Sequence, residues 1–214
     1  ARGITQIGVI KYLEEQGYTI DEVVGCSIGA LVGAAFAEGK LEDLAIWMRA
    51  LTKMQVFKLM DFSDPRYGLL KGERVLASLQ AVFEDVAIEK LPIAYTAVAT
   101  DLKHEQEILF REGGLYEAIR ASIAIPGVFT GIDRKGEFLV DGGVLNPIPI
   151  NHVQHRDNLI IAVNLDGIPD LTKVGFPKKL NTIALMQESY YAMRRKLSAL
   201  SIELYKPDYV IHVP

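Results

Sequence analysis

The chain contains a single cysteine, Cys26, among its 214 residues. One thiol excludes an internal disulfide and a cysteine-rich metal site. Cys26 stands in an apolar stretch, so we expect it to be a small buried side chain. No run of about 18 apolar residues occurs, and the sequence therefore predicts no membrane-spanning helix.

An excess of positive charge is also missing. The chain has 23 Lys and Arg against 27 Asp and Glu, a formal net charge of −4. No basic block of the nucleic-acid-binding type is present, so we expect no nucleic-acid partner. The one basic cluster, Arg194-Arg195-Lys196, is expected on the solvated face of a helix.

What is present is an alternation of strand-like and helix-like segments, typical of layered α/β domains. Half of the residues are apolar, and the length suits one domain with a sizeable core. Apolar spacing predicts helices over residues 4–16, 28–38, 41–54, 73–83, 115–122 and 181–205. It predicts strands over residues 20–26, 93–100, 107–111, 138–140, 159–165 and 209–213, the run 159–165 being buried on both faces.

The segment Gly25-Cys26-Ser27-Ile28-Gly29 has the pattern G-x-S-x-G between a predicted strand and a predicted helix. A serine on such a sharp turn has its hydroxyl exposed, and the flanking glycines allow close approach of backbone and substrate. Ser27 is therefore a candidate nucleophile. A neutral hydroxyl needs a base within hydrogen-bonding reach.

The chain has four histidines, and none of them is well placed in the sequence to be that base. They are His104, His152, His155 and His212. The better candidate is Asp141, which follows a predicted strand and precedes Gly142-Gly143. Active residues of parallel α/β sheets gather at the carboxyl ends of strands, where both Ser27 and Asp141 are expected. A partly desolvated carboxylate can accept the serine proton. Asp141 could equally form a local Asx turn, and the spacing alone does not separate the two roles.

Three ordered blocks together resemble the patatin-like phospholipase family, and in particular its small bacterial esterases. They are the G-x-S-x-G segment, the segment from Ala121 to Phe129 (ASIAIPGVF), and Asp141-Gly142-Gly143. The start, Ala1-Arg2-Gly3 before an Ile-rich helix, resembles the end of that family's glycine-rich first block. The likeness covers most of the chain.

The resemblance implies a three-layer α/β/α sandwich with a mostly parallel central sheet, a variant of the α/β-hydrolase architecture. It implies a Ser27–Asp141 dyad that hydrolyses acyl esters of lipids, of the phospholipid or lysophospholipid class, through an acyl-enzyme. No metal or organic cofactor is implied. Arg2, Gly3, Gly25, Ile28, Gly29, Gly142 and Gly143 would form the motif and oxyanion region. The protein is expected to be cytoplasmic, with transient contact at a membrane surface.

One departure concerns the family's oxyanion glycines, which precede the Arg-Gly pair and would lie ahead of Ala1. The expectation is a single domain over residues 1–214 that lacks its first strand and glycine-rich loop. The Ile28 N–H would then be one remaining oxyanion donor at a helix N-terminus. Two alternatives stay open, an acyltransferase on the same architecture and a non-catalytic lipid-binding module. Sequence does not indicate the oligomeric state.

Overall fold

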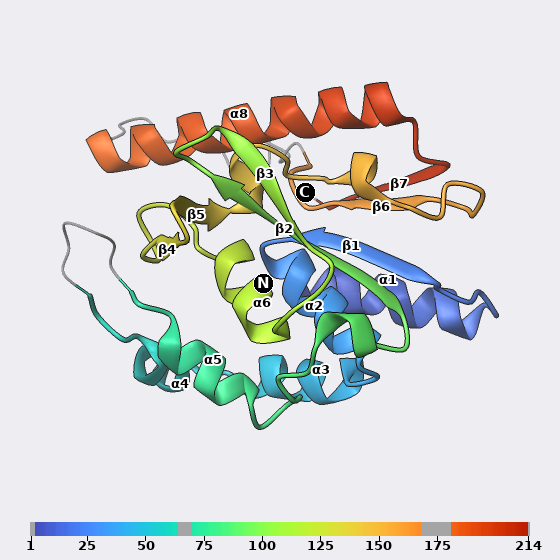
Figure 1. Cartoon of the computed structure of the whole chain (residues 1–214), viewed down its shortest axis with the longest axis horizontal. Helices are drawn as coiled ribbons and strands as arrows, with labels where there is room; N and C mark the ends of the chain where they lie inside the picture. The colour runs from blue at the N-terminus through green and yellow to red at the C-terminus, as the bar shows by residue number, and fades with distance from the viewer. Residues whose placement is uncertain (1–2, 64–69, 168–180, 214) are drawn as a thin grey trace.

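The computed structural model describes residues 3–63, 70–167 and 181–213. Its centre is a five-stranded sheet built on β2 (Ala94–Asp101), the strand to which three others pair directly (Figure 1). The three are β1 (Glu22–Cys26), β3 (Gln106–Phe110) and β5 (Glu137–Asp141). The fifth strand, β4 (Ile132–Arg134), pairs with β5 and was not anticipated.

Two strands lie end to end along one edge of β2. β1 pairs with residues 94–98 of β2, and β5 pairs with residues 99–101. β3 pairs with residues 97–101, overlapping both, so it must occupy the opposite edge. Because β1 runs parallel to β2 and β5 runs antiparallel to it, the carboxyl ends of β1 and β5 point toward each other.

The sheet is mixed, and the expectation of a mostly parallel sheet is corrected. Among its described strands only the β1–β2 pair is parallel, while the β2–β3, β2–β5 and β4–β5 pairs are antiparallel. Short turns join β2 to β3 and β4 to β5, and a short turn can join only antiparallel neighbours. A second sheet pairs β6 (Ile161–Asn164) with β7 (Tyr209–His212) in parallel.

Helices cover the central sheet from both sides. α2 (Ile28–Ala37) contacts β1 and β2, and α6 (Leu115–Ser122) contacts β2 and β5. All eight residues from position 30 to 37 are buried, as the apolar composition of this segment predicted. The outer helices of this side are α1 (Gly3–Glu15), α3 (Leu41–Ala50), α4 (Lys53–Leu59) and α5 (Glu73–Leu79).

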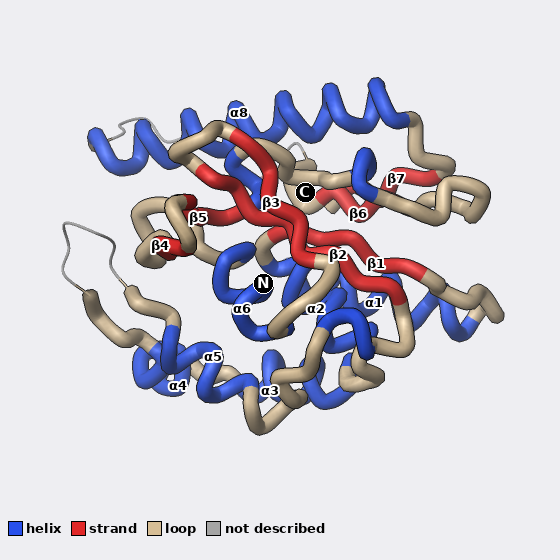
Figure 2. Tube along the Cα trace, viewed as in Figure 1, coloured by secondary structure: helices blue, strands red, loops and turns tan. Residues whose placement is uncertain are grey.

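The long helix α8 (Thr182–Tyr205) lies on the opposite side of the molecule from α3, α4 and α5 (Figures 1 and 2). It packs on the short 3₁₀ helix η3 (Ile150–His152), which follows η2 (Gly142–Val144) in the chain. A third short helix, η1 (Ile88–Lys90), precedes β2. The α/β/α sandwich is thereby confirmed. Among the described helices, none combines the length and apolar character needed to cross a membrane.

Two sequence expectations need correction. The helix predicted over residues 41–54 ends at Ala50, and a second helix, α4, begins at Lys53, because Thr52 caps α4 in a reciprocal capping box with Gln55. The apolar run 159–165 is shorter as a strand, and its side chains alternate between half-buried and buried. Leu159 is 50% exposed, so this segment is not covered on both faces.

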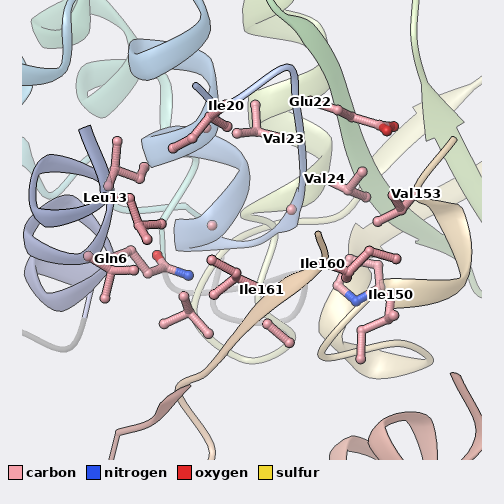
Figure 3. Close-up of a pocket in the computed structure, with 18 of the residues that line it drawn as sticks. Gln6, Leu13, Ile20, Glu22, Val23, Val24, Ile150, Val153, Ile160 and Ile161 are labelled. Carbon is pink, nitrogen blue, oxygen red and sulfur yellow. The ribbon is translucent and has the colours of Figure 1, made fainter. Parts of the chain in front are cut away.

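A cavity of about 430 Å³ separates β1 from β6 (Figure 3). We call it the β1–β6 groove. Residues 18–26 line one wall and residues 158–163 the other, while α1 and α2 contribute apolar side chains. β1 pairs only with β2, and β6 only with β7, among the described strands. The groove therefore has a strand edge without a partner strand on each side.

Candidate active site

Ser27 occupies a strained turn between β1 and α2. Its backbone has φ 55° and ψ −129°, a conformation that non-glycine residues rarely adopt. The Ser27 N–H is held by Ser122 at the end of α6, with 2.9 Å to the hydroxyl and 3.2 Å to the carbonyl oxygen. The surrounding structure thus fixes the turn that projects the half-buried Ser27 side chain.

Of the two flanking glycines of the motif, Gly25 is required by the space around it. A Cβ at Gly25 would lie 2.5 Å from the carbonyl carbon of Gly29 and 2.8 Å from the Ala30 nitrogen. A Cβ at Gly29 would lie 3.3 Å from the Gln6 side chain. The first turn of α2 therefore packs directly on the end of β1, and only glycine at position 25 permits this.

Asp141 ends β5 and is completely buried. Its Oδ1 accepts a 2.7 Å hydrogen bond from the Gly143 N–H, so it does form the local turn that the sequence left open. Its Oδ2 is buried, and none of the described residues forms a hydrogen bond with it. A Cβ at Gly142 would lie 2.1 Å from the Val98 carbonyl oxygen, which explains the glycine after the aspartate. The local turn uses one carboxylate oxygen and leaves the other available.

The register on β2 brings the two residues together. Cys26 pairs with Val98, and Asp141 pairs with the next residue, Ala99. Ser27 follows Cys26 directly, so it reaches the point on β2 where β5 ends. Sequence analysis placed both residues at carboxyl ends of strands, but the strands meet tip to tip rather than side by side.

The end of α6 connects the two residues. The Ser122 hydroxyl donates to the Val98 carbonyl at 2.7 Å while it accepts from the Ser27 N–H. Two residues later, the Ala124 carbonyl accepts from the Asp141 N–H at 2.9 Å. The segment from Ala121 to Phe129, one of the three motif blocks, therefore anchors both candidate catalytic residues.

The electrostatics of Asp141 favour a protonatable carboxyl. Burial raises its pKa, while the Ser27 side chain, the Arg194 guanidinium and the Gly143 N–H lower it in part. The Ser27 hydroxyl is thus near the carboxyl, and within the described part of the chain Oδ2 has no hydrogen-bond partner. Catalytic hydrogen bonds are often long in unliganded enzymes and shorten when substrate binds.

Arg194 contradicts the expectation for the basic cluster 194–196. Its side chain is only 14% exposed and forms an ion pair with Asp166, at 3.1 Å between Nη2 and Oδ2. Its Nη1 lies 3.7 Å from Asp141 Oδ1. The helix periodicity predicted α8 but not which face carries a buried cation. Arg194 and Asp166 are site residues that sequence analysis missed.

The other residues predicted for the motif and oxyanion region include Ile28, Gly3 and Arg2. Ile28 opens α2, where backbone N–H groups have no acceptor within the helix. Gly3 is packed against Ile28, since a Cβ there would lie 2.2 Å from Ile28 Cγ1. Arg2 lies outside the described residues. Cys26 is buried as expected, and burial raises its pKa.

The histidines have other partners. His104 contacts Asp101, and His152 bonds to Glu107 at 2.7 Å. His155 lies 3.9 Å from Glu22, and His212 lies 3.3 Å from the Asn164 amide. Among the described contacts, none joins a histidine to Ser27. The residues described also include no group of three or more His, Cys, Asp or Glu side chains arranged to hold a metal ion.

The family model described as patatin-like phospholipase matches residues 1–153, which include both Ser27 and Asp141. The chain belongs to the patatin-like phospholipase family. The match extends across the strand-turn-helix at Ser27 and the turn after β5. The resemblance drawn from three short blocks is thereby confirmed for the family.

Two relatives illustrate that similar proteins can be longer than this chain. An uncharacterised NTE family protein of Mycobacterium tuberculosis is 45% identical over 168 residues, covering 78% of this chain and 47% of that protein. Lysophospholipase NTE1 of Kluyveromyces lactis is 29% identical over 190 residues, 85% of this chain and 13% of that protein. The chain therefore spans about half or less of the length of these relatives.

A solved structure agrees on the fold. The crystal structure of VipD from Legionella pneumophila matches with a TM-score of 0.50 and 16% identity, covering 94% of this chain and 53% of that one. At this identity the match concerns architecture alone. It supports the patatin-like arrangement of layers described above.

Proposed function

We propose that this chain hydrolyses acyl esters of lipids through a Ser27–Asp141 dyad. The observation that carries the proposal is that Ser27, which is strained and half-buried, lies beside Asp141, which is fully buried. One oxygen of the Asp141 carboxylate has no hydrogen-bond partner among the described residues. An unpartnered polar atom in the interior costs free energy and persists where function needs it. No histidine contacts Ser27 in the described structure, which favours a dyad over a triad.

In the proposed reaction, the Ser27 Oγ attacks the ester carbonyl carbon while its proton passes to Asp141 Oδ2. Collapse of the tetrahedral intermediate breaks the ester C–O bond, and the proton leaves with the alcohol. Water then attacks the acyl-enzyme with Asp141 again as base, which releases the fatty acid and restores the Ser27 hydroxyl. The raised pKa of Asp141 suits a group that must both accept and return a proton.

Oxyanion stabilisation is assigned to the start of α2. The Ile28 N–H directly follows the nucleophile, at the positive end of the helix. Gly3 packs on the Ile28 side chain and holds α1 against this point. We propose that Arg2 and Gly3 continue the oxyanion region, as the family resemblance implies.

The proposed substrate class is phospholipid or lysophospholipid. Its support is the family membership and the similarity to a protein named lysophospholipase. A lipid substrate requires contact with a lipid surface. The exposed apolar side chains of α4 support such contact, since Met54 is 64% and Phe57 61% exposed beside Lys53 and Lys58. We propose transient peripheral binding of a cytoplasmic protein.

The proposal is tested with a fluorophosphonate probe and a lysophospholipid substrate. The wild type should be labelled at Ser27, with the adduct located by mass spectrometry. Ser27→Ala should abolish labelling and hydrolysis, and Asp141→Asn should reduce both by several orders of magnitude. Ser78→Ala on α5 and Asp133→Asn on β4 are matched controls that should keep both.

Several outcomes would contradict the proposal. Full hydrolysis by Ser27→Ala or Asp141→Asn would exclude the dyad. Absence of labelling at every pH, with the fold intact by circular dichroism, would favour a non-catalytic lipid-binding module. Preferential transfer of the acyl group to an added alcohol over water would favour the acyltransferase.

We also propose that the β1–β6 groove is the place of the further strand expected ahead of Ala1. The groove offers unpartnered strand edges on both sides and apolar side chains from α1 and α2 (Figure 3). Backbone N–H and C=O groups need partners, which an extended peptide supplies and an acyl chain does not. A longer chain should protect the groove-facing amides of β1 and β6 from hydrogen exchange, and unchanged exchange would exclude this placement.

A further inference from the structure

A buried arginine reaches the candidate active site from α8. Arg194 forms two contacts with Asp166 Oδ2, from Nε at 3.2 Å and from Nη2 at 3.1 Å. Its Nη1 donates to the Tyr190 hydroxyl at 3.4 Å and lies 3.7 Å from Asp141 Oδ1. The guanidinium therefore bridges a carboxylate at the end of β6 and the carboxylate at the end of β5.

The fold makes room for this contact at one residue. A Cβ at Gly143 would lie 2.1 Å from Arg194 Nη1 and 2.8 Å from its Cζ. Gly143 also donates its N–H to Asp141 Oδ1, the same oxygen that Arg194 approaches. The second glycine of the motif thus admits the guanidinium beside the carboxylate, and Oδ2 stays free for Ser27.

We propose that Arg194 is a positioning residue for Asp141, held in place by Asp166. This inference rests on the proposed dyad. The Gly143 N–H donates to Oδ1 and the guanidinium pairs electrostatically with the same oxygen, and together they orient Oδ2 toward the nucleophile. The guanidinium charge also keeps the buried carboxylate ionised at a pH where burial alone would protonate it.

Other charged or titratable groups face the same carboxylate. Asp166, beyond Arg194, raises the pKa of Asp141, but it acts more weakly than Arg194, which lowers it. Cys26 and Tyr190 are both buried or half-buried, and burial raises the pKa of each, so neither carries charge near neutral pH. Arg194 is therefore the cation that opposes the effect of burial on Asp141 within the described residues.

The test compares charge-removing and charge-keeping variants. Arg194→Gln retains hydrogen-bonding groups for Asp166 and Tyr190 but removes the charge, while Arg194→Lys keeps the charge. The rate of fluorophosphonate labelling at Ser27 is measured from pH 5 to 10. We expect Arg194→Gln to lose about tenfold at pH 6 and to recover toward the wild-type rate at pH 9. Arg194→Lys should restore most of the loss at pH 6.

A second variant guards against a folding defect. Removing one partner of a buried ion pair can be strongly destabilising, because it leaves the other charge uncompensated. Arg194→Gln/Asp166→Asn removes both charges, and because Arg194 has the larger effect on Asp141, it should shift the profile in the same direction. Arg195→Gln, the next residue of α8, controls for loss of one positive charge on this helix.

Failure of this inference is separable from failure of the dyad. A folded Arg194→Gln protein with the wild-type pH profile, or with an equal loss at every pH, would overturn the positioning role. Retained labelling in Ser27→Ala would instead overturn the proposed function. If Ser27→Ala loses labelling while Arg194→Gln and Arg194→Gln/Asp166→Asn both keep the wild-type pH profile, the positioning role of Arg194 is rejected and the dyad stands.

Discussion

The strained backbone at Ser27 gives a stability prediction that is independent of substrate. Ser27→Ala and Ser27→Gly both remove the hydroxyl, but only glycine adopts φ 55° and ψ −129° without steric cost. We therefore expect the glycine variant to be the more stable of the two. Both variants should be inactive, so the comparison isolates the energy stored in the turn.

The magnitude follows from two opposing terms. A non-glycine residue held in such a conformation costs about 1–3 kcal/mol. Glycine loses about 0.5–1 kcal/mol more than alanine in backbone entropy on folding. Ser27→Gly should therefore exceed Ser27→Ala by about 1 kcal/mol in free energy of unfolding. In a domain of this size, that difference corresponds to about 2–4 °C in melting temperature.

The measurement is equilibrium urea unfolding of both variants and the wild type, supported by thermal melts. A Ser27→Ala protein as stable as Ser27→Gly, or more stable, would refute the reasoning that the turn stores strain. The backbone N–H of residue 27 keeps its two hydrogen bonds to Ser122 in each variant, so these bonds do not contribute to the difference in stability.

Three further predictions concern the surroundings of the dyad. Ser122→Ala leaves the buried Val98 carbonyl without its hydroxyl donor, which should lower the free energy of unfolding in urea by about 1–3 kcal/mol and slow probe labelling at Ser27. Unchanged stability and labelling would contradict the anchoring role of Ser122. Gly142→Ala forces a Cβ to 2.1 Å from the Val98 oxygen and should lower the free energy of unfolding by about 1–3 kcal/mol or more. Its control is Gly8→Ala, where the Cβ meets no atom within 4 Å and should stabilise the helix by about 0.5–1 kcal/mol. Because burial raises the pKa of Asp141, the wild type loses stability as pH rises above the unfolded-state pKa of about 4. Asp141→Asn should therefore gain in melting temperature relative to the wild type between pH 4 and pH 7. A difference in melting temperature between the two proteins that stays constant over this range would argue against the raised pKa.

Local features of the fold were well predicted from sequence. The helix over 115–122 and the strand over 107–111 were placed correctly, because apolar spacing and breakers such as Pro126 act over a few residues. The break between α3 and α4 was missed. There the capping box of Thr52 and Gln55 outweighed a continuous helical pattern.

Long-range features could not be predicted in the same way. Whether a strand pairs parallel or antiparallel depends on turn lengths and on which edge of β2 is free, and neither is a property of the strand's own residues. The end-to-end arrangement of β1 and β5, which joins Ser27 to Asp141, is of this kind.

By itself, the sequence determined the strand-turn-helix at Ser27, the strand before Asp141 and the family to which the chain belongs, because short-range sterics and motif order suffice for these. Only the tertiary structure decided the environment of Asp141. Arg194 stands in a basic cluster that is typical of a solvated helix face, yet α8 places it in the interior between Asp166 and Asp141. The burial and pairing of a charge depend on which surfaces meet, and residues 53 positions apart in sequence meet here only through the packing of the whole domain.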